Sequence, residues 1–300
     1  MPFAVVGLGE VLWDLLPSGA QLGGAPTNFA GHAGALGAAA SVITRIGHDL
    51  LGRQVLERFT QMRWPVSTVQ MDIAHPTGTA AVALSAAGVP EFKIADDAAW
   101  DYLQMTESAL RSVRAADAIC FGSLAQRHPT SRATIQQLVA AARPEALRIF
   151  DINLRQRHYS QEVIERSLRL ASVLKLNEAE LPVLQEMFAL SGDAAAQLEQ
   201  LAQAFELTTL VLTRGPAGSL IYHHGAWSEC ASRPVRVVDT VGAGDAFTAA
   251  LTMGLLRKLE LPRVHAAAEE LAGFVCSRAG AMPRLPEKMQ FVGMEWEGRR

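Results

Sequence analysis

Apolar residues along the chain follow two alternating patterns. Short apolar runs predict buried strands, and longer stretches with an apolar residue every three or four positions predict helices. Strands that alternate with helices at this spacing indicate βαβ units and a mostly parallel sheet, which is an α/β fold. The predicted strands are 3–9, 41–47, 118–122, 147–153, 172–177 and 208–215. One predicted helix follows GGAPTN and another ends near Met62. The remaining predicted helices span 107–114, 131–142, 161–170 and 194–205.

The alternation is interrupted between residues 66 and 94. Here STVQMDI, GTAAVALS and PEFKIA form short extended runs that proline and glycine separate. Such runs predict a small antiparallel patch within the α/β chain. The patch is either a lid or an oligomer face, or it is an ordinary extension of the edge of the main sheet.

The stretch VVDTVGAGDAFTAALTMGLL, residues 237–256, carries the strongest candidate chemistry. It predicts a strand at 235–238, a tight glycine turn, and an amphipathic helix that begins near Gly242. Gly242 and Gly244 leave the backbone bare at a helix N-terminus, where N–H groups without internal partners bind anions such as phosphate. The turn is therefore a candidate phosphate site.

Asp245 lies in the first turn of the same predicted helix. There its carboxylate is within reach of a hydroxyl that approaches the bound phosphate. An anion site beside a carboxylate base is what phosphorylation of an alcohol requires. The alternative is an ordinary helix start after a glycine turn, with Asp245 favoured there by the helix dipole.

The segment GGAPTN, residues 23–28, is a second candidate site. Gly23 and Gly24 permit a close approach of the backbone to a ligand, and Asn28 lies in the first helical turn after them. With Asp14 in the preceding loop, the segment offers a carboxylate and an amide to neighbouring hydroxyl groups. The alternative is a helix start with a polar first turn.

Polar residues also follow three of the predicted strands, at the edge where parallel sheets bind ligands. One set fits a surface loop, the second fits a capping box at a helix start, and the third fits a tight turn. A ligand-binding role is open for each set. The sets are Asp151, Asn153 and Arg155; Asn177 and Glu180; and Thr213, Gly215 and Gly218.

Two familiar nucleotide motifs fail in this chain. Gly7 and Gly9 follow a strand, but Leu12 stands where the third glycine of a dinucleotide fingerprint belongs. The spacing of 47–52 fits a P-loop, but the following Arg53 replaces the lysine that binds phosphates. The sequence therefore does not support a nicotinamide dehydrogenase or a P-loop enzyme.

Composition narrows the class of protein further. Nearly half of the 300 residues are hydrophobic (49%) and 19% are charged, which fits one large α/β domain with a buried core. A net charge of −3 without a basic cluster argues against nucleic acid or an anionic membrane as a partner. Three widely spaced cysteines do not form a disulfide framework or a zinc site. The N-terminus lacks the features of a signal peptide, so we expect a soluble cytoplasmic protein.

The motifs together resemble the ribokinase-like (PfkB) carbohydrate kinases, in the same order and over essentially the whole chain. GGAPTN is similar to the sugar-binding signature of that family, and DTVGAGDAF to its catalytic signature. NEAE matches the N-x-x-E motif, and LTRGPAG the nucleotide-binding loop. The resemblance implies a single domain over 1–300, a three-layer sandwich with a mostly parallel central sheet, and a small antiparallel β lid from about 10–22 and 66–102.

The resemblance also implies a role for each site residue. Asp245 would be the base that takes a proton from the primary hydroxyl of the sugar. Arg155 would help beside the sugar or the phosphate, and Asp239 fits a loop that binds a monovalent cation such as K⁺ in members that depend on one. The other implied roles are an anion hole at Gly242, Ala243 and Gly244, sugar binding by Asp14, Gly23, Gly24 and Asn28, contacts to Mg²⁺ and phosphates through water by Asn177 and Glu180, and contacts along ATP by Thr213, Gly215 and Gly218.

Within that family, GEVLWDLLP, DINLR and IADDAAWDYL look most like bacterial fructokinases. The resemblance implies a homodimer through the lid and an ATP- and Mg²⁺-dependent enzyme that converts fructose to fructose 6-phosphate. The alternative acceptors are ribose, a nucleoside and 2-keto-3-deoxygluconate. Arg155 or Lys93 would pair with the carboxylate of 2-keto-3-deoxygluconate. A non-catalytic sugar or nucleotide sensor is disfavoured because Asp245 and both glycines are intact.

Overall fold

The computed structural model describes residues 1–16, 19–84 and 90–286. Within them, nine strands form one large sheet. Every pairing from β11 across to β5 is parallel, and β12 and β13 are added antiparallel at one edge. The strand order is β13 (Ala226–Cys230), β12 (Ser219–His223), β11 (Thr209–Thr213), β10 (Val173–Asn177), β9 (Leu147–Asp151), β8 (Ala118–Phe121), β1 (Ala4–Leu8), β4 (Ala39–Gly47) and β5 (Val69–Asp72).

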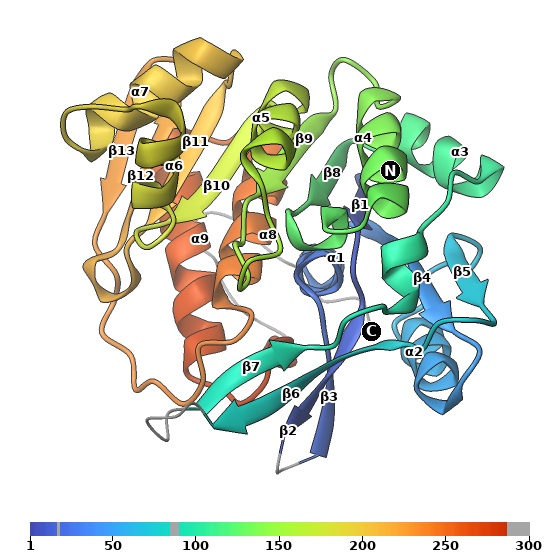
Figure 1. Ribbon diagram of the computed structural model, residues 1–300. Helices are drawn as coiled ribbons and strands as arrows, with labels where there is room; N and C mark the ends of the chain where they lie inside the picture. Colours follow the sequence, from blue (N-terminus) through green and yellow to red (C-terminus); the bar gives the residue numbers. More distant parts are fainter. Residues whose placement is uncertain (17–18, 85–89, 287–300) are drawn as a thin grey trace.

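Helices cover both faces of this sheet, which gives three layers (Figure 1). Neighbouring strand residues point to opposite faces, so Val5 packs into one core and Val6 into the other. Strands buried on both faces have apolar runs, and this explains the continuous hydrophobic segments of the sequence. One face carries α1 (Ala25–Ala35), α8 (Ala243–Leu256) and α9 (Leu261–Cys276), with α2 (Leu50–Gln61) packed beside α1, and the other carries α3 (Glu107–Ala115), α4 (Pro129–Ala140), α5 (Gln161–Leu170), α6 (Leu181–Phe188) and α7 (Ala194–Phe205).

Helix α8 is buried almost all round. Every residue from Ala246 to Gly254 is buried, because the helix packs between α1, α9 and the sheet. The prediction of an amphipathic helix was therefore wrong about its polar face. The predicted start near Gly242 is confirmed, since α8 begins at Ala243.

A second sheet of four strands lies at the carboxyl ends of the main strands (Figure 1). It consists of two antiparallel hairpins whose inner strands β2 and β6 pair in parallel. The segment after β1, expected to be a loop, is the first of these hairpins. The sheet order is β3 (Gly19–Gly23), β2 (Leu12–Leu16), β6 (Gly78–Leu84) and β7 (Pro90–Ile94).

Two other predictions need correction. The first extended run of the interrupted region forms β5, which extends the edge of the main sheet, so only the later two runs belong to the small sheet. The predicted strand at 235–238 is irregular and largely exposed, and it pairs with no strand in the described part of the chain. No helix in the described part of the chain is long and apolar enough to span a membrane.

Candidate active site

The two strongest sequence motifs meet at the carboxyl edge of the main sheet. Helices α1 and α8 pack side by side, with their N-terminal turns together. The Asn28 Nδ2 group donates a hydrogen bond of 2.8 Å to Asp245 Oδ2 across 217 positions of sequence. The fold therefore joins GGAPTN and DTVGAGDAF in one site.

Asp245 is partly buried by this arrangement. Burial, above all, and the negative charge of Asp151 raise the pKa of its carboxyl group, which all its surroundings together bring to about 6. The hydrogen bond from Asn28 and the charges of Lys175 and Arg155 oppose this rise. A carboxylate with such a pKa is ionised at neutral pH and is still a better proton acceptor than an exposed aspartate.

The turn before α8 depends on its first glycine. Gly242 has φ of 79°, in the left-handed region, and a side chain there would strike the carbonyl oxygen of Ala281. Ala243 N–H donates to the Thr240 carbonyl at 3.3 Å, so one of the three predicted anion-binding groups takes part in the turn itself. The N–H groups that follow in the first turn lie at a helix start, where no helical acceptor exists for them.

Arg155 contributes positive charge to the same site. It lies in the loop after β9. Its charge opposes the rise that burial causes in the pKa values of Glu10, Asp14 and Asp245. Asp14, on β2 of the small sheet, lies against Gly23, and partial burial raises its pKa to about 6. The structure therefore brings the predicted sugar-binding residues together with the candidate base.

Glu10 is a site residue that the sequence analysis missed. It lies two residues after the end of β1, its side chain is buried, and burial raises its pKa to about 7. Glu10 Oε2 and Asn28 Oδ1 are both buried and have no hydrogen-bond partner among the described residues. The signal for Glu10 was an acid directly after a predicted apolar strand, and its carboxyl group also hydrogen-bonds to the backbone of Ala25 at the start of α1.

A buried ion pair beneath the start of α8 was also missed. Lys175 Nζ, from β10, lies 3.1 Å from Asp151 Oδ1, from β9. Asp151 Oδ2 accepts a hydrogen bond of 3.1 Å from Thr248 of α8. The signal for Lys175 was a single lysine inside the apolar run SVLKLN.

The N-x-x-E segment has a structural explanation. Asn177 Oδ1 accepts a hydrogen bond from Glu180 N–H, and Glu180 Oε2 accepts one from Asn177 N–H, which is the reciprocal pattern of a capping box. Glu180 Oε1 also accepts the Leu154 N–H at 2.8 Å. Both carboxylate oxygens of Glu180 are therefore used to hold the loops after β9 and β10 together.

The remaining predicted residues lie further along the same edge. The loop from Thr213 to Gly218 is a tight turn between β11 and β12, and a side chain on Gly218 would strike the Cys230 carbonyl. Asp239 accepts N–H groups of Val241 and Gly280, each at 3.0 Å, and so ties its loop to the chain after α9. No cluster of three or more metal-ligating side chains occurs among the described residues.

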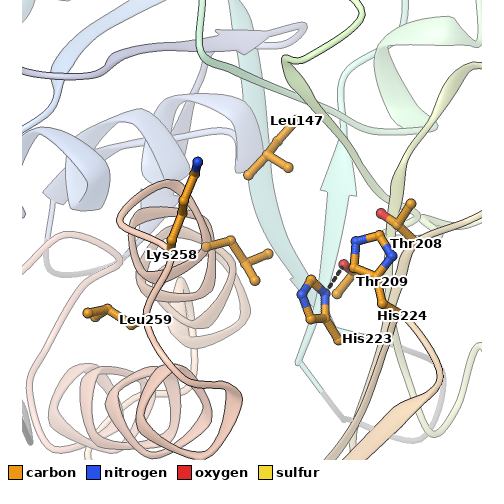
Figure 2. Close-up of a pocket in the computed structure, with 8 residues that line it drawn as sticks. Leu147, Thr208, Thr209, His223, His224, Lys258 and Leu259 are labelled. Carbon is orange, nitrogen blue, oxygen red and sulfur yellow. Dashed lines mark hydrogen bonds between the residues drawn. The ribbon is translucent and has the colours of Figure 1, made fainter.

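A cavity of about 360 Å³ lies away from all of these residues (Figure 2). It lies near the amino ends of β9 and β11, at the opposite edge of the main sheet from Asp245. None of the predicted site residues lines it. The lining residues are Leu147, Thr208, Thr209, His223, His224, Leu255, Lys258 and Leu259.

Comparison with known proteins identifies the family. The model of the pfkB family of carbohydrate kinases matches residues 19–288. The chain belongs to this family. It is an enzyme, a carbohydrate kinase, with the ribokinase-like α/β fold that the sequence motifs implied.

The matches to individual relatives cover nearly the whole of this chain. It is 32% identical to a fructokinase from Klebsiella pneumoniae, over 94% of this chain and 95% of that protein. It is 28% identical to the structure of an uncharacterized sugar kinase from Pyrococcus horikoshii in complex with ATP, with a TM-score of 0.77 over 93% of this chain and 94% of that one. A fructokinase from Xylella fastidiosa with bound ATP has the same fold, with a TM-score of 0.83 at 22% identity over 94% of each chain.

Proposed function

We propose that this carbohydrate kinase transfers the γ-phosphoryl group of ATP to the primary 6-hydroxyl of fructose. The observation that carries the proposal is the hydrogen bond of 2.8 Å between Asn28 and Asp245, which supports the assignment of Asn28 to the sugar and of Asp245 to the general base. The buried acceptors Glu10 Oε2 and Asn28 Oδ1 favour a ligand rich in hydroxyl donors. The Klebsiella pneumoniae and Salmonella typhimurium fructokinases, each 32% identical to this chain, support fructose as the acceptor.

In the proposed reaction, Asp245 removes the proton from the sugar hydroxyl as the hydroxyl oxygen attacks the γ-phosphorus of ATP. The bond between the γ-phosphorus and the β,γ-bridging oxygen breaks, and ADP leaves. Asn28 holds the carboxylate in position through its amide. The free N–H groups of the first turn of α8 bind the transferred phosphoryl group, and Arg155 balances the negative charge that collects in the site. Asp14 binds a sugar hydroxyl from the small sheet, which excludes water when it closes over the ligands.

The residues present fit a Mg²⁺ ion bound through water. Glu180 already accepts two backbone N–H groups, so direct coordination would break the clamp between two loops. Mg²⁺ keeps several waters in kinase sites and is held largely by the substrate phosphates. Asn177 and Glu180 would then contact those waters, and the ion would neutralise phosphate charge. We assign Thr213, Gly215 and Gly218 to the nucleotide.

We extend the proposal to K⁺ at the Asp239 loop. Asp239 does not supply a free carboxylate there, because both of its oxygens accept backbone N–H groups. It holds the shape of the loop, and backbone carbonyl oxygens would be the ligands. Activity measured with K⁺ replaced by tetramethylammonium tests this assignment, and unchanged activity would contradict it.

A sugar acid such as 2-keto-3-deoxygluconate is disfavoured by the charge of the site. Three carboxyl groups, those of Glu10, Asp14 and Asp245, lie within electrostatic reach of one arginine, Arg155. A carboxylate on the acceptor would add a further negative charge. Lys93, the other candidate partner, lies on β7 with an exposed side chain.

Release of ADP from Mg-ATP in the presence of single acceptors tests the proposal. We expect fructose to give the highest kcat/KM in a panel with ribose, 2-keto-3-deoxygluconate and a nucleoside. Asp245→Asn is the control, because it retains the fold and removes the base. A higher kcat/KM with another acceptor would replace fructose, and ADP release that no acceptor stimulates would favour the sensor interpretation.

We also propose that the protein acts in the cytoplasm as a homodimer paired through the small sheet. Strands β3 and β7 are the edges of that sheet, and edge strands offer unpaired backbone groups to a second copy. Sedimentation velocity at micromolar concentration tests the pairing. A monomer at every concentration would contradict it.

A further inference from the structure

We propose that Lys175 is a positioning residue, which places a buried positive charge directly beneath the anion site at the start of α8. The inference rests on the proposed function, because it assigns that anion site to the transferred phosphoryl group. Neither the sequence motifs nor the comparisons give Lys175 a role. The proposal also covers Asp151 and Thr248, which fix the lysine relative to the helix.

The contacts form a continuous path from the sheet to the helix. Lys175 Nζ lies 3.1 Å from Asp151 Oδ1, and the two side chains are only 7% and 4% exposed. Asp151 Oδ2 accepts a hydrogen bond of 3.1 Å from the Thr248 hydroxyl, which also lies 2.9 Å from the Gly244 carbonyl oxygen. The ion pair is therefore tied to the first turn of α8 by its own side-chain contacts.

The lysine also touches the anion site directly. A Cβ atom on Gly244 would lie 2.8 Å from Lys175 Nζ, so the ammonium group lies against the backbone whose N–H groups bind the phosphoryl group. A side chain at the second glycine of the motif would therefore meet the lysine, although this glycine has no positive φ. A methyl group there would push the lysine away from Asp151 or the helix away from the sheet.

Stability alone does not account for such a pair. Removing two charges from water costs about as much as their attraction returns, and apolar residues of similar size are often as stable. Lys175 keeps its proton, because the charges of Asp151, Glu180 and Asp245 raise its pKa against the effect of burial. A fixed cation in a region of low dielectric attracts an anionic phosphoryl group more strongly than it would in water.

The test compares Lys175→Met/Asp151→Asn with the wild-type protein. The double variant removes both charges, so it avoids the unpaired buried aspartate that Lys175→Met alone would leave. We expect kcat to fall about 100-fold, in the range for loss of an electrostatic contact to a reacting group, with the KM for the sugar within about threefold of wild type. The acid limb of the pH profile should also move downward, because the lost charge of Asp151, which raises the pKa of Asp245, outweighs the lost charge of Lys175, which lowers it.

A matched pair of threonine variants on α8 provides the control. Thr248→Val breaks the link to Asp151 and should lower kcat about tenfold, which corresponds to one lost hydrogen bond. Thr252→Val, one turn further along, removes only a hydrogen bond to the Thr248 carbonyl and should retain kcat within about twofold. Equal effects of the two variants would contradict a specific role for the path through Thr248.

Calorimetric titration with ATP and with ADP gives a readout that does not depend on the sugar. The double variant should lose about tenfold in ATP affinity, in the range for one charge contact, and less in ADP affinity, because only ATP carries the γ-phosphate. A folded double variant with wild-type kcat, acid limb and ratio of ATP to ADP affinity would overturn the proposal. A wild-type protein that binds ATP but phosphorylates no sugar would contradict the proposed function instead. The titration would still test whether Lys175 contributes to ATP binding.

Discussion

The surroundings of Asp245 suit the role of general base that we propose for its carboxyl group. Burial makes the charged form less favourable, and Asn28 restores part of the loss by donating one hydrogen bond. The result is a pKa of about 6, close to the pH at which the enzyme must work. A carboxylate on the surface would be ionised at neutral pH but would be a much weaker base.

Replacement of Asp245 by asparagine should lower kcat by about 10²–10⁴, the usual contribution of general base catalysis. The amide keeps the size of the side chain and cannot accept the proton. For the wild-type enzyme, kcat/KM should fall below a pH of about 6, because protonation removes the base. Initial rates of ADP release between pH 5 and pH 8 check both expectations, and activity near the wild-type level in the variant would exclude Asp245 as the base.

Glu10→Gln should stabilise the folded protein at pH 8 and have little effect at pH 5. The pKa of Glu10 rises from 4.5 to about 7 on folding, so the folded state holds its proton more tightly. The free energy of unfolding therefore decreases as the pH rises through this window, by at most about 3 kcal/mol, and glutamine removes the effect.

Urea denaturation of the two proteins at pH 5 and pH 8 measures this difference. Glu57→Gln, at an exposed position of α2, is the control and should leave the pH dependence of stability unchanged. The buried histidines His32 and His265, whose pKa values are lowered to about 4, act in the opposite direction but equally in all the variants. A stability difference that does not grow with pH would show that Glu10 is not buried as an acid.

At the scale of elements, the start of α8 depends on the conformation of one glycine. Gly242→Ala should destabilise the protein by more than about 2 kcal/mol, because a left-handed φ and a clash with the Ala281 carbonyl act together. Gly225, in the turn after β12, also has a positive φ, but a side chain there would meet nothing within 4 Å. Gly225→Ala should therefore cost about 1 kcal/mol.

Thermal unfolding and fructose turnover of the two variants separate these effects. Gly225→Ala should keep kcat within about twofold of wild type, since its turn lies far from the chemistry. Gly242→Ala should lose at least about tenfold in kcat, because the anion-binding N–H groups move with the turn. Similar stability and similar activity in both variants would contradict the role given to the Gly242 turn.

The secondary-structure elements show what a local sequence pattern can predict and what it cannot. Strands such as β1 and β10 were predictable because burial on both faces leaves a continuous apolar run. The burial of α8 on all sides was not predictable, because a helix enclosed by other helices has no polar stripe. The sheet to which β5 belongs was not predictable either, since register and partner are decided by the fold as a whole.

Some residues of the candidate site were also predictable from the sequence, and others were not. Asn28 and Asp245 could be predicted because each lies in a motif whose local geometry already suggests its chemistry. The roles of Lys175 and Glu10 could not, because a single charge in or after an apolar run indicates a buried charge but not which residues surround it. Their roles arise only when strands far apart in sequence place them under the N-termini of α1 and α8.

At the scale of the molecule, the site is divided between two sheets. The main sheet and its helices hold Asp245 and the phosphate site, whereas Asp14 comes from β2 of the small sheet (Figure 1). With the proposed roles, we expect sugar binding to depend on how the small sheet lies over the main one. We expect ATP binding to depend mainly on the loops after β10 and β11.

Asp14→Ala should therefore raise the KM for fructose by at least about tenfold and change the KM for ATP by less than about threefold. The variant removes a carboxylate that accepts sugar hydroxyl groups, a charged hydrogen bond of about 1.5–3 kcal/mol. Leu15→Ala is the matched control, because neighbouring residues of a strand point to opposite faces and the Leu15 side chain is 41% exposed. Initial rates with each substrate varied in turn give both KM values. An equal rise for fructose and ATP would mean that Asp14 supports the whole cleft instead of the sugar, and the assignment of β2 to the sugar site would then be wrong.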